Sequence, residues 1–190
     1  MSRAVPPMRL TGDSRLAVID MQGRLLKAIR QGAEVTAQCR RLALAARELA
    51  IPVAVTEQNP AGIGPTVDPL AALAGQRFGK VHFSAAEDAD FRTWAASGGT
   101  VVLCGVEAHV CVLQTALGLA ERGIPCVLVA DAVASRDARN RDAAIARARH
   151  HGIDVLTAEM VLFEWLGRYD RPEFKRILPL IKNRTAPADQ

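Results

Sequence analysis

The chain has 190 residues, of which 49% are hydrophobic and 23% charged, and this length and composition are typical of one soluble globular domain. The formal net charge is +4, but the arginines are spread out and alternate with aspartates, as in SRDARNRDAAIARAR (135–149), and only 4% of the residues are aromatic. A nucleic-acid surface needs clustered basic side chains and aromatic rings for stacking. The composition therefore argues against a nucleic-acid partner.

The cysteines and histidines show no metal-binding or disulfide pattern. The four cysteines form no C-x-x-C pair, and the four histidines do not fall at zinc-finger spacings, so neither a disulfide framework nor structural zinc is expected. No stretch has the apolar core of a signal peptide or approaches the roughly 18 uninterrupted apolar residues of a membrane span. We therefore expect a cytoplasmic protein with reduced thiols and no membrane partner.

Short apolar runs alternate with longer stretches of helical period along most of the chain. Residues 1–14 hold Pro6, Pro7 and Gly12 and predict an N-terminal tail, and residues 183–190 predict a C-terminal tail. Between them, 15–182 is expected to form a single domain. The predicted strands are 15–20, 51–57, 76–81, 99–105, 124–131 and 152–157, and the predicted helices are 34–50, 88–97, 108–123, 141–151, 158–167 and 172–182. The alternation predicts an α/β fold, a three-layer α/β/α sandwich around a six-stranded, mostly parallel, Rossmann-like sheet.

Candidate functional residues follow three of the predicted strands. Open parallel sheets bind ligands at the carboxyl ends of their strands, and Asp20 and Lys80 stand at the ends of the first and third runs, while Cys111 follows the fourth. No G-x-G-x-x-G opens a helix after the first run, and neither G-x-x-x-x-G-K-[ST] nor G-x-S-x-G occurs. Dinucleotide binding, P-loop phosphate binding and serine α/β-hydrolase chemistry therefore lose support.

Cys111 allows two interpretations by position alone. It stands in or beside the first turn of the predicted helix 108–123, where free N–H groups and the helix dipole would lower the pKa of its thiol from about 8.5 to roughly 3.5–7.5. The alternative is a buried small hydrophobe, as Cys39, Cys104 and Cys126 are expected to be. Asp20 alone could cap a loop, bind a metal or act as a base, and a strand-end lysine is usually just solvated.

Taken together, these residues and their surroundings resemble the isochorismatase-like cysteine hydrolases. The resemblance runs from about Arg15 to Lys182, and its motifs are AVIDMQ (17–22), TEQNPAGIGPTV (56–67), GKVHFS (79–84), VVLCGVEAHVCVLQTALGLAERG (101–123) and VLVADAVASR (127–136). Within that superfamily the chain is most similar to the hydrolases related to YcaC and to the isochorismatase-domain-containing proteins.

The resemblance implies a catalytic triad of Asp20, Lys80 and Cys111. It also implies a cis peptide at Val106–Glu107, and an oxyanion hole made of the backbone N–H groups of Glu107 and Cys111. In that scheme Asp20 takes the thiol proton, Lys80 stabilises the anions, and Cys111 forms a covalent acyl-enzyme that water clears. The family further implies a homo-oligomer.

The sequence also leads to expectations about the substrate pocket, the cofactor and the substrate. Gln22, Gln58 and Phe83 are expected to line the substrate pocket. Related nicotinamidases carry an Asp-x-His metal element where this chain has TEQNP (56–60), so we expect no metal and no cofactor, and a small amide-like or related carbonyl substrate, with C–N bond cleavage favoured. Two alternatives remain: a non-catalytic or redox-responsive domain on the same fold, and an isochorismatase-type vinyl-ether hydrolase, which needs no cysteine nucleophile.

Overall fold

The computed structural model describes residues 10–182. Residues 1–9 of the predicted N-terminal tail, and the whole predicted C-terminal tail, lie outside the described residues. Within residues 10–14, Leu10 and Ser14 are buried, and the Leu10 N–H donates to the Glu164 carboxylate over 2.9 Å. These contacts hold residues 10–14 against the domain, and the boundary at residue 15 stays a prediction.

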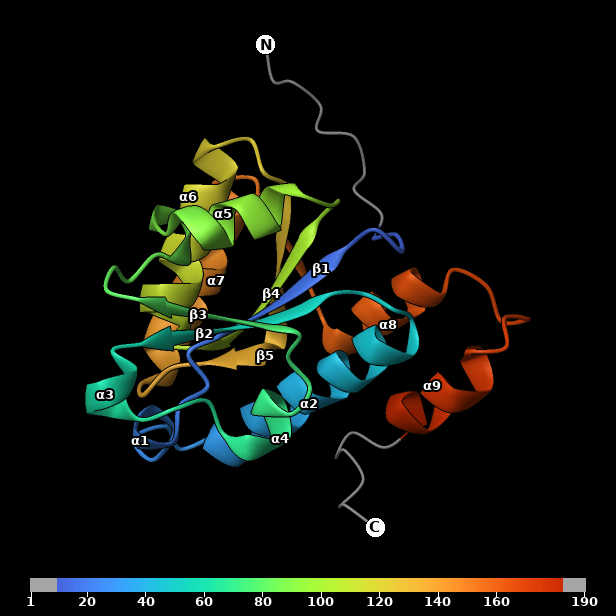
Figure 1. Cartoon of the computed structure of the whole chain (residues 1–190), viewed down its shortest axis with the longest axis horizontal. Helices are drawn as coiled ribbons and strands as arrows, with labels where there is room; N and C mark the ends of the chain where they lie inside the picture. The colour runs from blue at the N-terminus through green and yellow to red at the C-terminus, as the bar shows by residue number, and fades with distance from the viewer. Residues whose placement is uncertain (1–9, 183–190) are drawn as a thin grey trace.

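The described residues fold around a six-stranded parallel sheet with strand order β3-β2-β1-β4-β5-β6. The strands are β1 (Arg15–Ile19), β2 (Val53–Gln58), β3 (Gln76–Lys80), β4 (Val101–Val106), β5 (Cys126–Ala134) and β6 (Asp154–Leu156). Helices cover both faces (Figure 1). The predicted fold class is therefore confirmed.

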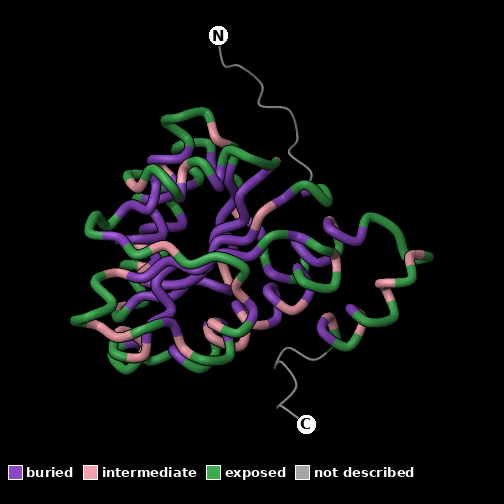
Figure 2. Tube along the Cα trace, viewed as in Figure 1, coloured by how far each residue is buried: buried purple, intermediate pink, exposed green. Residues whose placement is uncertain are grey.

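Helices of the two outer layers pack on alternate residues of the strands. One layer holds α2 (Gly32–Glu48), α8 (Ala158–Leu166) and α9 (Phe174–Lys182), and the other holds α5 (Ala89–Ala96), α6 (Leu113–Glu121) and α7 (Ala138–His150). In β1, Leu16 and Val18 belong to the first core, whereas Ala17 and Ile19 belong to the second. Because successive side chains of a strand point to opposite faces, a central strand must be apolar throughout, and Figure 2 shows these strands buried.

Four strands, β2, β4, β5 and β6, begin two residues later than predicted, and two of these starts lie next to a proline. Strands β2 and β5 begin at Val53 and Cys126, each two residues later than expected, directly after Pro52 and Pro125. Proline has no N–H to donate to a neighbouring strand, although the carbonyls of Pro52 and Pro125 still accept from the N–H groups of Leu16 and Val101. Strand β5 also extends to Ala134. Its pairing with β4 is irregular between Leu103 and Gly105 of β4 and resumes where Gly105 pairs with Val133.

Several short elements are too short to give a periodic signal in the sequence. They are the helices α1 (Gly23–Leu26), α3 (Pro60–Ile63) and α4 (Asp68–Ala71), and the 3₁₀ turn η1 (Ala85–Glu87). The predicted helix 108–123 is divided into a π-helical turn, η2 (Ala108–Val112), and the α-helix α6. Single π-turns of this kind occur frequently at functional sites.

The strand order changes side at β1, which places a topological switch point between β1 and β4. Strands β2 and β3 extend the sheet on one side of β1, and β4 then returns to pair with β1 on the other side. Gly105, in β4, has φ +115° and approaches β1 so closely that an added Cβ would lie 2.1 Å from the carbonyl oxygen of Ile19. Only glycine fits such an approach without strain. The carboxyl ends of β1 and β4 are thereby brought together at a topological switch point, the usual ligand site of such sheets.

Candidate active site

Asp20 follows β1 directly and is completely buried. Its φ of +48° is unusual for a residue other than glycine and costs of order 1–3 kcal/mol, which the surrounding structure must offset. The side chain is held on both oxygens: Oδ1 accepts from the Thr56 hydroxyl over 2.6 Å, and Oδ2 accepts from Lys80 Nζ over 2.7 Å. Thr56 also accepts from the Asp20 N–H over 3.2 Å. The sequence offered no specific signal for this role of Thr56.

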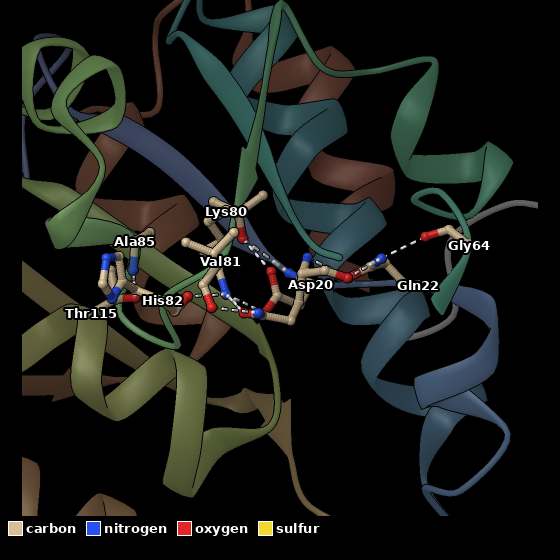
Figure 3. A network of polar contacts seen from close by, with 10 residues as sticks. Asp20, Gln22, Gly64, Lys80, Val81, His82, Ala85 and Thr115 are labelled. Carbon is tan, nitrogen blue, oxygen red and sulfur yellow. Dashed lines mark hydrogen bonds and ion pairs between the residues drawn. The ribbon is translucent and has the colours of Figure 1, made fainter. Parts of the chain in front are cut away.

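Lys80, the last residue of β3, forms a buried ion pair with Asp20 (Figure 3). The exposed fractions of the two side chains are 1% and 0%. The ammonium also donates to Gln58 Oε1 over 2.7 Å and, at a longer 3.4 Å, to the carbonyl oxygen of His82. Lys80 is therefore not the solvated strand-end lysine that position alone would favour.

Cys111 lies in the π-helical turn, where Asp20 and Lys80 both act on the pKa of its thiol. Burial, followed by the negative charge of Asp20, raises the pKa of the Cys111 thiol to about 12, even though the Lys80 ammonium opposes these two effects. The sequence-based prediction of a lowered pKa is therefore wrong. It considered only the helix terminus, whereas the fold places a carboxylate and little water beside the sulfur. At neutral pH the resting side chain is a thiol.

The other three cysteines are small core residues, as predicted. Cys39 and Cys104 are fully buried and Cys126 nearly so. Their sulfurs contact backbone carbonyls of Ala132, Ala17 and Ala116. Burial raises the pKa of Cys39 well above its usual value and that of Cys126 to about 12. What distinguishes Cys111 is its pair of charged neighbours.

The segment before Cys111 is fixed to the loop after β5. The peptide bond between Val106 and Glu107 is cis. The Glu107 carboxylate accepts from the backbone N–H and the Nε of Arg136, over 2.9 and 3.2 Å. The Glu107 carbonyl oxygen accepts from the N–H groups of Val110 and Val112. That the N–H groups of Glu107 and Cys111 receive an oxyanion stays a prediction.

The three expected pocket residues lie in different surroundings. Gln22 is fully buried, and its amide bonds the Gln58 backbone and the carbonyl oxygen of Gly64. Gln58 is partly buried and contacts Lys80. Phe83 is 55% exposed. Gln22 thus holds the backbone of Gln58 in place, and Phe83 is the expected pocket residue whose side chain is exposed.

The TEQNP stretch uses its carboxylate for an internal contact. Glu57 Oε1 accepts from the N–H and the hydroxyl of Thr66, over 2.7 and 2.8 Å, and from Arg77 over 2.9 Å. Within residues 10–182 there is no group of three or more His, Cys, Asp or Glu side chains placed to hold a metal ion. In the same range, every helix is too short or too polar to cross a bilayer.

Comparison of the sequence with known proteins identifies relatives of this chain. Residues 14–160 match the model of the isochorismatase domain. The chain is 37% identical over 177 residues to isochorismatase domain-containing protein 2 of Bos taurus, covering 91% of this chain and 85% of the bovine protein.

Solved structures give the same result. The chain superimposes on the MAR1 ribonuclease of Caenorhabditis elegans with a TM-score of 0.89 and 34% identity, over 96% of this chain and 100% of that one. It superimposes on YcaC from Pseudomonas aeruginosa, solved with hexane-2,5-diol and covalent acrylamide, with a TM-score of 0.85 and 26% identity over 93% of each chain.

Proposed function

Because the chain belongs to the isochorismatase-like hydrolase family, we propose that it is a metal-independent cysteine hydrolase acting on a small amide-like or related carbonyl substrate, with C–N bond cleavage expected. The observation that carries this proposal is the buried Asp20–Lys80 ion pair beside the Cys111 thiol. The desolvation of a buried pair can exceed its Coulomb gain. Its presence at the ligand-binding end of the sheet, next to a nucleophile, therefore favours a catalytic role.

The raised pKa of Cys111 determines the first step. Because the resting group is a thiol, its proton passes to the Asp20 carboxylate as the sulfur bonds to the substrate carbonyl carbon. The carbonyl π electrons move to oxygen, and the backbone N–H groups of Glu107 and Cys111 receive the oxyanion. The oxyanion then collapses and expels the amine, which takes the proton from Asp20. An acyl-thioester on Cys111 remains.

The second half of the reaction restores the enzyme. Asp20 removes a proton from water as the water oxygen adds to the thioester carbonyl carbon, and the C–S bond breaks to release the acid. The proton on Asp20 returns to the sulfur. Lys80 remains an ammonium throughout, lying next to whichever of Asp20 and Cys111 is negative.

We further propose that the protein works in the cytoplasm as a homo-oligomer without a bound cofactor. Val81 and Phe83, which follow the catalytic lysine, are 83% and 55% exposed. Burying them against another subunit would remove apolar surface from water beside the site. Light scattering of the purified protein, compared with a Val81→Asp variant, tests this: a monomeric wild type would contradict it.

Labelling with acrylamide tests the nucleophile, since a covalent acrylamide is present in the P. aeruginosa relative. At pH 7, mass spectrometry should show Cys111 modified well before Cys39, Cys104 and Cys126. Equal, slow labelling of all four thiols would contradict the proposal. In a screen of small amides and esters, any hydrolysis found should fall by roughly three orders of magnitude or more in Cys111→Ala.

The same screen separates the alternatives. A redox-responsive domain would hydrolyse none of the compounds and would oxidise reversibly at Cys111. A vinyl-ether hydrolase would keep its activity in Cys111→Ala. An RNA oligomer belongs in the screen as well, because the C. elegans relative is called a ribonuclease.

A further inference from the structure

Gln58, at the end of β2, directs its side-chain amide toward the catalytic lysine. Its Oε1 accepts from Lys80 Nζ over 2.7 Å, and its Nε2 donates to the carbonyl oxygen of Val81 over 2.9 Å. The amide oxygen and one N–H are therefore already in use. This arrangement differs from that of a residue whose amide is presented to a substrate.

Chemistry determines which end of the Gln58 amide faces the lysine. An amide has an acceptor end and a donor end of nearly equal size. In the reversed orientation, its NH₂ would face the Lys80 ammonium and its oxygen would face the Val81 carbonyl, and both contacts would be repulsive. The Gln58 oxygen must therefore face the lysine.

Gln22 fixes the backbone of Gln58. The Gln22 Oε1 accepts from the Gln58 N–H over 2.8 Å, and the Gln22 Nε2 donates to the Gln58 carbonyl oxygen over 3.1 Å and to that of Gly64. Gln22 is fully buried, so competition from water is small. Gln58 is held at both its backbone and its side chain.

The ammonium of Lys80 has three N–H groups, each of which can donate a hydrogen bond. Two are taken at 2.7 Å by Asp20 and Gln58, while the His82 carbonyl oxygen is a longer 3.4 Å away. Gln58 differs from Asp20 in being neutral. It therefore fixes the direction of the ammonium without cancelling its charge.

We propose that Gln58 is a positioning residue: as a neutral acceptor it holds the Lys80 ammonium between Asp20 and Cys111, and leaves the charge of that ammonium available to the developing thiolate. The inference rests on the proposed cysteine hydrolase. It differs from the sequence-based expectation, in which Gln58 contacts the substrate.

Two thiol reagents of different chemistry distinguish these roles. Acrylamide carries an amide group like the proposed substrate, whereas methyl methanethiosulfonate carries none, yet both require a reactive sulfur at Cys111. A substrate-contacting residue would affect acrylamide alone. A residue that positions Lys80 should affect both reagents.

The experiment compares Gln58→Met, Gln58→Glu and the matched control Gln76→Met, at the exposed first residue of β3, with the wild type. Gln58→Met keeps the chain length and removes the acceptor, so Cys111 should react about 10-fold more slowly, or slower still, with both reagents. Gln58→Glu keeps an acceptor but adds a negative charge, and both rates should again fall by about 10-fold. Gln76→Met makes the same substitution away from the site and should leave both rates unchanged. Circular dichroism establishes that each variant is folded, and Gln58→Glu carries the test if Gln58→Met is not.

The outcomes separate this inference from the proposed function. Loss of the acrylamide rate alone in Gln58→Met, or loss of neither rate, would overturn the positioning role. A wild-type rate in Gln58→Glu would overturn the need for a neutral acceptor. If wild-type Cys111 reacts no faster than Cys126 with either reagent, the proposed function fails first, and the role of Gln58 fails with it.

Discussion

Removing the ammonium of Lys80 should cost far more stability than an ion pair on the surface would suggest. Lys80→Met keeps most of the side-chain volume but leaves the Asp20 carboxylate, which has no exposed surface, with the Thr56 hydroxyl as its side-chain donor. Breaking a buried pair from one side typically costs about 3–5 kcal/mol, because an uncompensated charge remains. We expect a loss of this size in the free energy of unfolding, measured in urea at one fixed protein concentration.

The double variant Asp20→Asn with Lys80→Met tests the reasoning. It removes both charges, so its stability should return to within about 1–2 kcal/mol of the wild type, and the two single substitutions should be strongly non-additive. Acrylamide labelling of Cys111 should nevertheless stay slow, because the base and the cation are both gone.

A half-exposed pair provides the matched control. Glu87 and Arg122 form an ion pair with side-chain exposed fractions of 43% and 33%, and Glu87→Gln should cost only about 0–1 kcal/mol. If Lys80→Met costs no more than Glu87→Gln and the double variant is simply additive, the description of Asp20 and Lys80 as a dry, coupled pair is refuted.

Three further changes give sharp outcomes. Gly105→Ala puts a Cβ 2.1 Å from the Ile19 carbonyl oxygen at a φ of +115°, so the midpoint of thermal unfolding should fall by at least several degrees; an unchanged midpoint would contradict this close approach. Thr56→Val removes a donor to Asp20 and should slow acrylamide labelling by about 10-fold, with recovery in Thr56→Ser; equal rates in both variants would argue against a role for the hydroxyl. Burial raises the pKa of Cys126 to about 12 from its ordinary 9.0, so the folded state keeps a proton that the unfolded chain loses, and stability falls as the pH rises from 9 toward 12. Urea unfolding of Cys126→Ala should therefore show a shallower decline over that range, and parallel curves would refute the assignment.

That Asp20, Lys80 and Cys111 lie at one edge of the sheet could be predicted from the strands, whereas their assignment as a triad rested on the family resemblance. Each residue stands at or just after the carboxyl end of a predicted strand, and the carboxyl ends of parallel strands share one edge of the sheet. Four strands were predicted to start two residues too early, and for two of them, β2 and β5, the apolar pattern continues through Pro52 and Pro125 although a backbone donor is missing there. Apolar periodicity reports burial, whereas strand limits also depend on hydrogen bonding.

Features inside the site that the sequence could not predict have a different physical origin. The pKa of Cys111 and the contacts of Gln22 and Gln58 depend on side chains brought together from separate strands. The π-helical turn could not be distinguished from the first turn of an α-helix, because both place apolar residues on the same face over so few positions. A local argument at a helix terminus thus gave the wrong sign for a pKa that the loss of water and the Asp20 carboxylate after β1 determine.

The high pKa of Cys111 and its proposed role as nucleophile are consistent once charge is counted for the whole triad. A resting thiolate would place two anions, on Asp20 and Cys111, around the single cation of Lys80 in a site with little water. With a thiol at rest, the triad holds one anion and one cation, and moving the proton to Asp20 leaves the same number of each. The step transfers negative charge from oxygen to sulfur beside a fixed ammonium, so the buried surroundings need not accommodate any additional net charge. Burial disfavours either anion, so replacing the Asp20 carboxylate charge by a Cys111 thiolate adds no new buried charge, and proton transfer to Asp20 also removes the repulsion of that carboxylate as the sulfur attacks.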